Sequence, residues 1–320
     1  MNEHSLKVLE FSKIVSLIGE RCLTPFGREE VDRIEPLYER DEIVRRQSEI
    51  SQLRDLIRFG DPFPLSRVED SRKQLSESKI EEIFIEAKDM LRILELVIVS
   101  IEINRYDREN RENFPLIDEY LKAIRAFPEL KAEIQRAIDD DGEIKDSASS
   151  KLKRIRSDLA ESKRRIVLRM EQIISKRPKQ AGWQDDVVTQ RGDRYVIGVP
   201  SSQYRTDIGI LHDRSQSGAT LFVEPAETVE LNNSINMLYQ EERQEIVRIL
   251  KALTAEIALR ADALIENCGL IGTLDAIHAC ADFSIAINGN QPAITDEPSF
   301  NLVDARHPLL IVRLGGVDKV

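Results

Sequence analysis

Residues 147–177 read SASSKLKRIRSDLAESKRRIVLRMEQIISKR and contain neither proline nor glycine. Apolar side chains recur there at intervals of three, four and seven residues, which predicts one face of a single long α-helix. The stripe is narrow, as is typical of a helix that packs against one partner rather than inside a whole core. Its members are Leu152, Ile155, Leu159, Ile166, Met170 and Ile173.

A small β region is predicted after this helix. Residues 186–191 and 194–199 contain β-favouring residues on either side of Gly192-Asp193, which predicts a hairpin with a two-residue turn. Residues 208–212 and 219–223 form a second predicted strand pair, joined by a turn rich in Ser, Gln and Gly.

A second long helix is predicted from Pro225 to about Cys268, with Gly269 as its end. Its apolar stripe allows it to run back antiparallel to the first long helix. The two helices would then form a pair that carries the β region at one end. The stripe comprises Leu231, Ile235, Leu238, Ile246, Ile249, Leu253, Ile257 and Leu264.

The remaining chain is predicted to be mostly helical. Thr24-Pro25 has the residue types that cap and begin a helix, and Asp41 is predicted to cap another, which Pro62 and Pro64 end. Apolar spacing predicts further helices over residues 5–18, 79–105, 115–125, 128–138 and 271–287, and a β-like run over residues 309–312.

Composition excludes several protein classes. The chain has 320 residues, a formal net charge of −11, 32% charged and 41% hydrophobic residues, which does not fit a membrane or a disordered protein. No secretory signal begins the chain, and the longest apolar run, residues 93–101, is far shorter than the ~20 residues that span a bilayer. Three cysteines without a C-x-x-C pair predict neither a disulfide framework nor a zinc site, and favour the cytoplasm.

Several motifs carry a family resemblance. They closely resemble the type-two branch of the bacterial MutS family, over nearly the whole chain, and the order of predicted elements resembles its lever and clamp layout. The motifs are Arg194-Tyr-Val-Ile-Gly-Val-Pro200, Gly209-Ile-Leu-His-Asp213, Ser217-Gly-Ala-Thr-Leu-Phe-Val-Glu-Pro225, Val229-Glu-Leu-Asn-Asn233, Leu9-Glu-Phe11, Thr24-Pro-Phe-Gly27 and Ala305-Arg-His-Pro-Leu-Leu310.

The resemblance implies a mainly α fold, in which a helical core domain bears a long antiparallel helical lever pair with a small antiparallel β clamp tip. The expected domains are a helical core (1–140), an ascending lever helix (141–178), the β clamp tip (179–224), a descending lever helix (225–268), a helical completion of the core (269–300) and the start of a junction to an ATPase domain (301–320).

The resemblance also implies a function for the intact protein. It would bind branched or mismatched DNA, suppress homologous recombination, act as a homodimer, use ATP and Mg, and have ATPase and endonuclease activity, the latter in a C-terminal Smr domain. No G-x-x-x-x-G-K-[ST] phosphate loop occurs in these residues. We therefore expect an N-terminal lever and clamp fragment without enzyme activity, cofactor or metal of its own.

Charge is concentrated in the first long helix. Between Lys145 and Arg177 there are eleven basic and four acidic residues, a net +7, so the rest of the chain carries −18. Such a surface can bind phosphates. It can equally be a solvated helix neutralised by Glu241, Glu242 and Glu245 of the returning helix. The candidate nucleic-acid-binding residues here are Lys153, Arg156, Lys163, Arg164, Arg165 and Arg169.

The β region adds cations near aromatic residues, a combination that holds nucleic-acid backbones and stacks on bases, although neighbouring acids weaken this interpretation. His212-Asp213 is not expected to be an acid–base pair, because adjacent strand residues point to opposite faces. Trp183 is expected to be a packing anchor. The candidate binding residues here are Arg191, Arg194, Arg205 and Arg214.

The sequence leaves two alternatives to DNA binding open. The narrow apolar stripe also fits a helical scaffold for protein–protein contact. The family resemblance also allows contact with the ribosome and its rRNA during rescue of stalled ribosomes.

Overall fold

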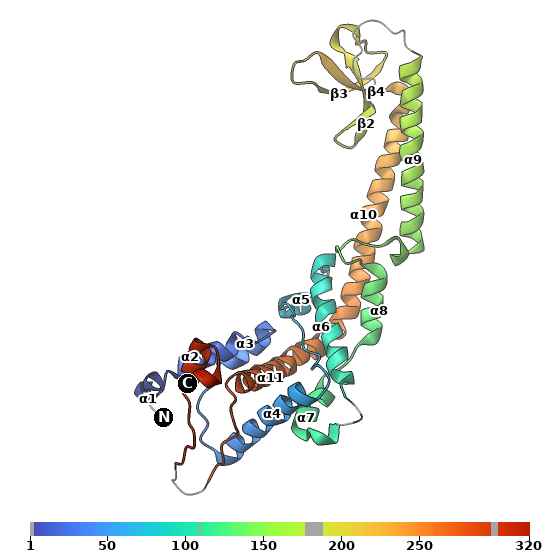
Figure 1. The fold of residues 1–320 in the computed structure, drawn as a ribbon. Coiled ribbons are helices and arrows are strands. Elements are labelled where there is room, and N and C mark those ends of the chain that lie inside the picture. The colour runs from blue at the N-terminus through green and yellow to red at the C-terminus, as the bar shows by residue number, and fades with distance from the viewer. Residues whose placement is uncertain (1–2, 108, 110, 177–187, 296–299) are drawn as a thin grey trace. The chain divides into compact units, whose positions relative to one another are not determined.

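A computed structural model describes residues 3–107, 109, 111–176, 188–295 and 300–320 (Figure 1). The protein is mainly helical with one small antiparallel sheet, which confirms the predicted fold class. The chain divides into two compact units. Unit 1 comprises Met1–Gln135, Asp140–Glu143 and Lys251–Val320, and unit 2 comprises Arg136–Asp139 and Ile144–Leu250. The finer domain boundaries expected from the sequence stay a prediction.

Unit 1 is built of helices around one central helix, α11 (Ala261–Ala286). By length and composition α11 could cross a membrane, but it packs against the helices α2 to α7, as the core helix of a folded domain does. The other helices are α1 (Glu3–Val8), α2 (Phe11–Gly19), α3 (Pro25–Asp32), α4 (Arg40–Phe59), α5 (Arg72–Glu77), α6 (Ala87–Arg105), α7 (Pro115–Ala123), most of α8 (Pro128–Ala137) and α12 (Pro308–Leu314).

A buried carboxylate on α11 fixes the start of α3. Asp275 accepts hydrogen bonds from the backbone N–H of Thr24 and from its Oγ1, both at 2.7 Å, and from the N–H of Leu23 at 3.1 Å. Thr24 Oγ1 in turn accepts from the N–H of Gly27, so Thr24 is the predicted cap of this helix. Burial raises the pKa of Asp275, against the lowering effect of these donors.

Unit 2 holds the first long helix, α9 (Ser150–Ser175), the sheet, and α10 (Val229–Ala258) as far as Leu250. The strands β1 (Val188–Arg191), β2 (Arg194–Pro200), β3 (Gly209–Arg214) and β4 (Thr220–Pro225) lie in the order β1-β2-β4-β3, and all pairs are antiparallel. Arg191 pairs with Arg194 across Gly192-Asp193, and Gly192 has a positive φ of 58°. The two predicted strand pairs are therefore confirmed over the described residues.

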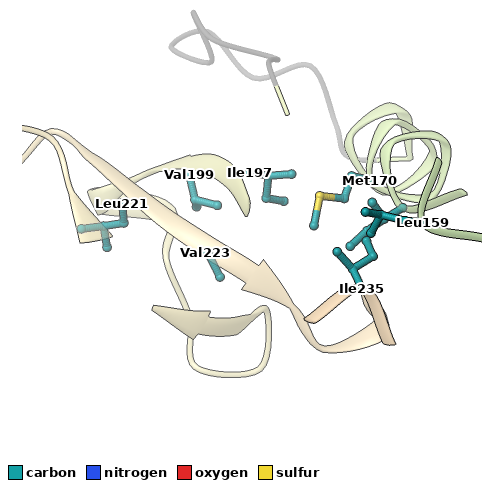
Figure 2. Packing of buried hydrophobic residues seen from close by; sticks show 8 residues of the cluster. Leu159, Met170, Ile197, Val199, Leu221, Val223 and Ile235 are labelled. Atoms are coloured by element: carbon teal, nitrogen blue, oxygen red, sulfur yellow. The ribbon is translucent and has the colours of Figure 1, made fainter. Parts of the chain in front are cut away.

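The predicted apolar stripe of α9 forms the core of unit 2. Its buried residues Leu159, Ile166 and Met170 pack against the inner face of the sheet and against Ile235 of α10. Figure 2 shows Met170 directed toward Ile197, with Leu159 and Ile235 beside it. The sheet contributes Ile197, Val199, Leu221 and Val223. The stripe thus joins the two helices to one face of the sheet.

Several predicted helix boundaries are wrong. Residues 5–18 are not one helix, because Glu10 adopts a left-handed conformation (φ 52°) between α1 and α2. Asp41 was predicted to cap the next helix, but α4 begins at Arg40 and its cap position is Glu39. The helix predicted over 79–105 begins at Ala87, because Glu82 has φ 68° and Ile80 and Ile83 are exposed. The apolar spacing before Ala87 therefore does not mark a helix.

The C-terminal part of the prediction also needs correction. The second long helix begins at Val229 and stops at Ala258, and α11 starts at Ala261. The break is therefore the two residues Leu259-Arg260, and Gly269 is inside α11. A break this short preserves the apolar spacing and leaves no gap in the pattern. Residues 309–312 are not β-like but lie in α12, which has Pro308 at its start and Gly315 with φ 71° at its end.

Candidate nucleic-acid interface

All ten predicted binding residues are described and lie in unit 2, but their side chains have different surroundings. Arg156, Arg169, Arg191, Arg194 and Arg205 form ion pairs. Lys163 lies over an aromatic ring. Within the described part of the chain, Lys153, Arg164, Arg165 and Arg214 have no ion pair.

The ion pairs of α9 tie it to α10. Arg156 Nε donates to Glu242 at 2.7 Å, and its Nη1 donates to Asp146 at 2.6 Å and to the Ile144 carbonyl at 2.8 Å. Lys163 Nζ lies 4.9 Å from the centre of the Tyr239 ring, close enough for a cation–π interaction. Residues with higher numbers in α9 contact residues with lower numbers in α10, so the two helices are antiparallel. Figure 1 shows them side by side.

A buried glutamate secures the beginning of α9. Glu245 accepts from Ser149 Oγ at 2.8 Å and from Arg248 Nη2 at 2.6 Å, and it pairs with Lys151 at 3.4 Å. Ser149 Oγ also accepts from the N–H of Leu152 and so caps α9. The hydrogen bonds from Arg248 and Ser149 lower the pKa of Glu245 to about 2. Glu242 and Glu245 of α10 therefore neutralise part of the positive charge of α9, which is one of the two interpretations that the sequence left open.

A second buried glutamate, on β4, gathers polar groups of the sheet and of α10. Glu224 is 1% exposed and receives hydrogen bonds from Arg194 Nη1 at 3.1 Å and from Asn232 Nδ2 at 2.8 Å. His212 Nε2 lies 2.6 Å from its other oxygen. Arg194 also donates to Asn233 Oδ1 at 2.8 Å. Arg194 is therefore held inward, and its predicted role in nucleic-acid contact stays a prediction.

The remaining cations of the sheet are more exposed. The guanidinium of Arg191 lies 3.9 Å from the centre of the Phe222 ring and pairs with Asp213 at 3.3 Å, while Arg205 pairs with Asp207 at 3.3 Å. Such solvent-exposed pairs contribute about 0–1 kcal/mol and are easily exchanged for a phosphate. His212 and Asp213 contact different partners, as their neighbouring strand positions predict.

Four cations remain exposed on one side of α9. We define the outer face of α9 as Lys153, Arg154, Arg164 and Arg165, which are all exposed and form no ion pair within the described residues. They lie opposite the buried stripe, since α-helical geometry places residues 153, 154, 164 and 165 away from 152, 159 and 166. Lys153, Arg164 and Arg165 belong to the predicted interface, and the structure adds Arg154 to them; the four cations are free to meet an anion.

Metal and thiol chemistry find little support in the described ranges. No three His, Cys, Asp or Glu residues are placed there to hold a metal ion. Cys22, Cys268 and Cys280 are free, and burial raises the pKa of each thiol, which favours the unreactive protonated form. Arg177 of the basic run, the proposed anchor Trp183 and the first residues of the hairpin lie outside the described residues.

Comparison with known proteins gives MutS2 endonucleases among the similar relatives. The chain is 35% identical to endonuclease MutS2 of Halothermothrix orenii, 34% to that of a Geobacillus species and 33% to that of Symbiobacterium thermophilum, with 97–99% of the chain aligned. This chain is a relative of the MutS2 proteins. It spans about two fifths of their length (40–41%) and resembles their N-terminal region. No family model matches the chain.

The residues of two motifs that resemble MutS2 contact one another in the structure. The motif Val229-Glu-Leu-Asn-Asn233 supplies the two asparagines that contact Arg194, Tyr195 and Glu224. Glu224 itself belongs to another of the motifs, Ser217–Pro225. Sequence reasoning missed Glu224 and Asn232 as partners. The available signal was the position of a glutamate at the end of an apolar strand and of paired asparagines in the first turn of a long helix.

Proposed function

We propose that this MutS2 relative binds the phosphate backbone of nucleic acid through unit 2, without reading sequence. The observation that carries this proposal is the outer face of α9, where four exposed cations are left without ion pairs among the described residues of a chain of net charge −11. Unpaired like charges repel one another on a helix surface. Binding to phosphates relieves that repulsion and releases counterions.

DNA is the nucleic acid we propose. The relatives are named endonuclease MutS2, and an endonuclease acts on nucleic acid. For the intact protein we propose the finer functions implied by the family resemblance: binding of branched or mismatched DNA, suppression of homologous recombination, homodimer formation, and use of ATP and Mg for ATPase and endonuclease activity. Residues 1–320 would supply the contact surface of that protein, and other segments would supply its chemistry.

The inward ion pairs support this role by making the surface rigid. Arg156 and Glu242 hold α9 against α10, and Glu224 and Arg194 hold the sheet against the start of α10. A rigid support means that the exposed cations lose less conformational entropy when they bind.

The test is fluorescence anisotropy of the 320-residue chain with labelled junction and duplex DNA over a salt series. Replacement of all four cations, K153Q/R154Q/R164Q/R165Q, is expected to weaken binding roughly tenfold or more and to flatten the salt dependence. The control R58Q/R67Q removes two exposed cations of unit 1 that lack an ion pair within the described residues. Equal affinity of the four-cation variant and the control would contradict the proposal.

The scaffold and ribosome alternatives are distinguished by the same material. A dimer that is tight and independent of concentration in light scattering, combined with no affinity for DNA, would support a scaffold. Preference for ribosomal RNA over DNA at equal salt would support ribosome contact.

A further inference from the structure

The outer face of α9 consists of two pairs of neighbouring cations. Lys153 and Arg154 form the first pair, and Arg164 and Arg165 form the second. Corresponding members are eleven residues apart, which is three helical turns plus about 20°, so both pairs point in the same direction. At a rise of about 1.5 Å per residue, the pairs lie about 16.5 Å apart along the helix axis.

The outer side of the interval between the pairs is acidic, because Arg156 and Lys163 of the same interval contact α10. Asp158 and Glu161 are exposed there, and within the described chain neither forms an ion pair with the four cations. A single DNA strand that ran along α9 would place a phosphate about every 3.4 Å of duplex axis and so would meet these carboxylates. The cations are therefore arranged for two separate phosphate groups rather than for one continuous strand.

The spacing corresponds to one groove of DNA. The major groove of B-form DNA is about 12 Å wide between its backbones, which gives about 17–18 Å between phosphates once half of each backbone is included. The minor groove, about 6 Å wide, gives only about 12 Å by the same reasoning. The distance of about 16.5 Å between the cation pairs matches the major groove.

We propose, as an extension of the proposed function, that α9 lies across the major groove of a B-form DNA duplex. Lys153 and Arg154 bind one backbone, and Arg164 and Arg165 bind the backbone on the other side of the groove. Asp158 and Glu161 then face the open groove, where there is no phosphate. An A-form RNA duplex also has one wide groove, its shallow minor groove, so the proposal is tested on B-form DNA.

The test compares the loss of each pair on one DNA duplex. Variants K153Q/R154Q and R164Q/R165Q are titrated with a DNA duplex of about 20 bp over a salt series. On DNA, each variant is expected to reduce the slope of log affinity against log salt by about 1.8, for two phosphates, and the two losses add. R58Q/R67Q is the control for loss of two positive charges.

A third variant tests the acidic interval. D158N/E161Q is expected to keep the wild-type slope on DNA, because no phosphate faces these residues. A slope that steepens by about 1.8 would mean that a strand runs along the helix, and would overturn the groove-crossing proposal. A pair variant that keeps the wild-type slope on DNA, because the other pair takes over, would also overturn it while leaving the proposed function in place. Absence of any binding to the duplex would overturn both.

Discussion

Asn232 of α10 hydrogen-bonds both backbone groups of Tyr195 on β2. The N–H of Tyr195 donates to Asn232 Oδ1 at 2.9 Å, and Asn232 Nδ2 donates to the Tyr195 carbonyl at 3.0 Å. The side-chain amide thus makes the pair of bonds that a neighbouring strand would make. One side chain therefore docks the sheet onto the helix and, through its bond to Glu224, joins the buried polar cluster.

Replacement of Asn232 by Ala is expected to loosen the sheet. The N–H of Tyr195 and the carboxylate of Glu224 each lose a buried partner, at a cost on the order of 2–3 kcal/mol. Hydrogen exchange of the β2 amides measures this directly and should accelerate. Ser234→Ala, at an exposed position of the same helix, is the control and should leave exchange unchanged.

Arg194 and Arg214 are expected to differ in their effects on stability, although both are arginines of the sheet. Arg194→Ala removes a donor from buried Glu224 and should destabilise unit 2 by about 2–3 kcal/mol. Arg214→Ala removes an exposed side chain and should change stability by less than about 0.5 kcal/mol. Urea unfolding of the two variants compares them. A loss for Arg194→Ala as small as that expected for Arg214→Ala would contradict the structural role of Arg194.

Glu245 is expected to make the attachment of α9 depend on pH. Its pKa is lowered from 4.5 to about 2 in the folded protein by hydrogen bonds from Arg248 and Ser149, so its stabilising contribution is complete above about pH 5 and is lost as the pH falls toward 2. The stability difference between wild type and Glu245→Gln should therefore shrink over that range. Urea unfolding at about pH 6, 4 and 3 measures it.

Gly209 and Gly218 are expected to respond differently to replacement by Ala. At Gly209 (φ 155°) a Cβ would lie 1.9 Å from the Glu224 carbonyl oxygen, a backbone atom that cannot move aside. At Gly218 (φ 71°) there is nothing within 4 Å, so only the left-handed conformation opposes a side chain. We expect a loss of about 3 kcal/mol or more for Gly209→Ala, against about 1 kcal/mol for Gly218→Ala. Thermal unfolding of both variants tests the order.

The spacing of residues correctly predicted those features of the fold that depend on a single helix or turn. The stripe from Leu152 to Met170 and the turn at Gly192-Asp193 were correct, because a 3.6-residue repeat and a two-residue turn are local signals. The break at Leu259-Arg260 was missed because two residues interrupt the backbone without disturbing the apolar spacing. The helix start at Ala87 was missed for the opposite reason, since Ile80 and Ile83 follow the spacing but are exposed.

The candidate interface was only partly predictable for a similar reason. The sequence identifies which residues are cationic, but not which of them have acidic partners. Arg156 and Arg194 meet Glu242 and Glu224, which are 86 and 30 residues away, and only the antiparallel packing of α9 and the register of the sheet bring them together. The outer face of α9 therefore becomes recognisable only once these pairs are known, and it includes Arg154, which was not among the predicted binding residues.

The exposed cations of α9 also affect how the protein behaves during purification. A net charge of −11 predicts retention on an anion exchanger and none on a cation exchanger. A sulfonate resin, however, contacts only part of the protein surface. Its fixed negative charges can pair with the cations on the outer face of α9, which have no acidic partner within the described structure. At low salt the protein should therefore adhere to both resins, and nucleic acid from the lysate should accompany it until the salt is raised.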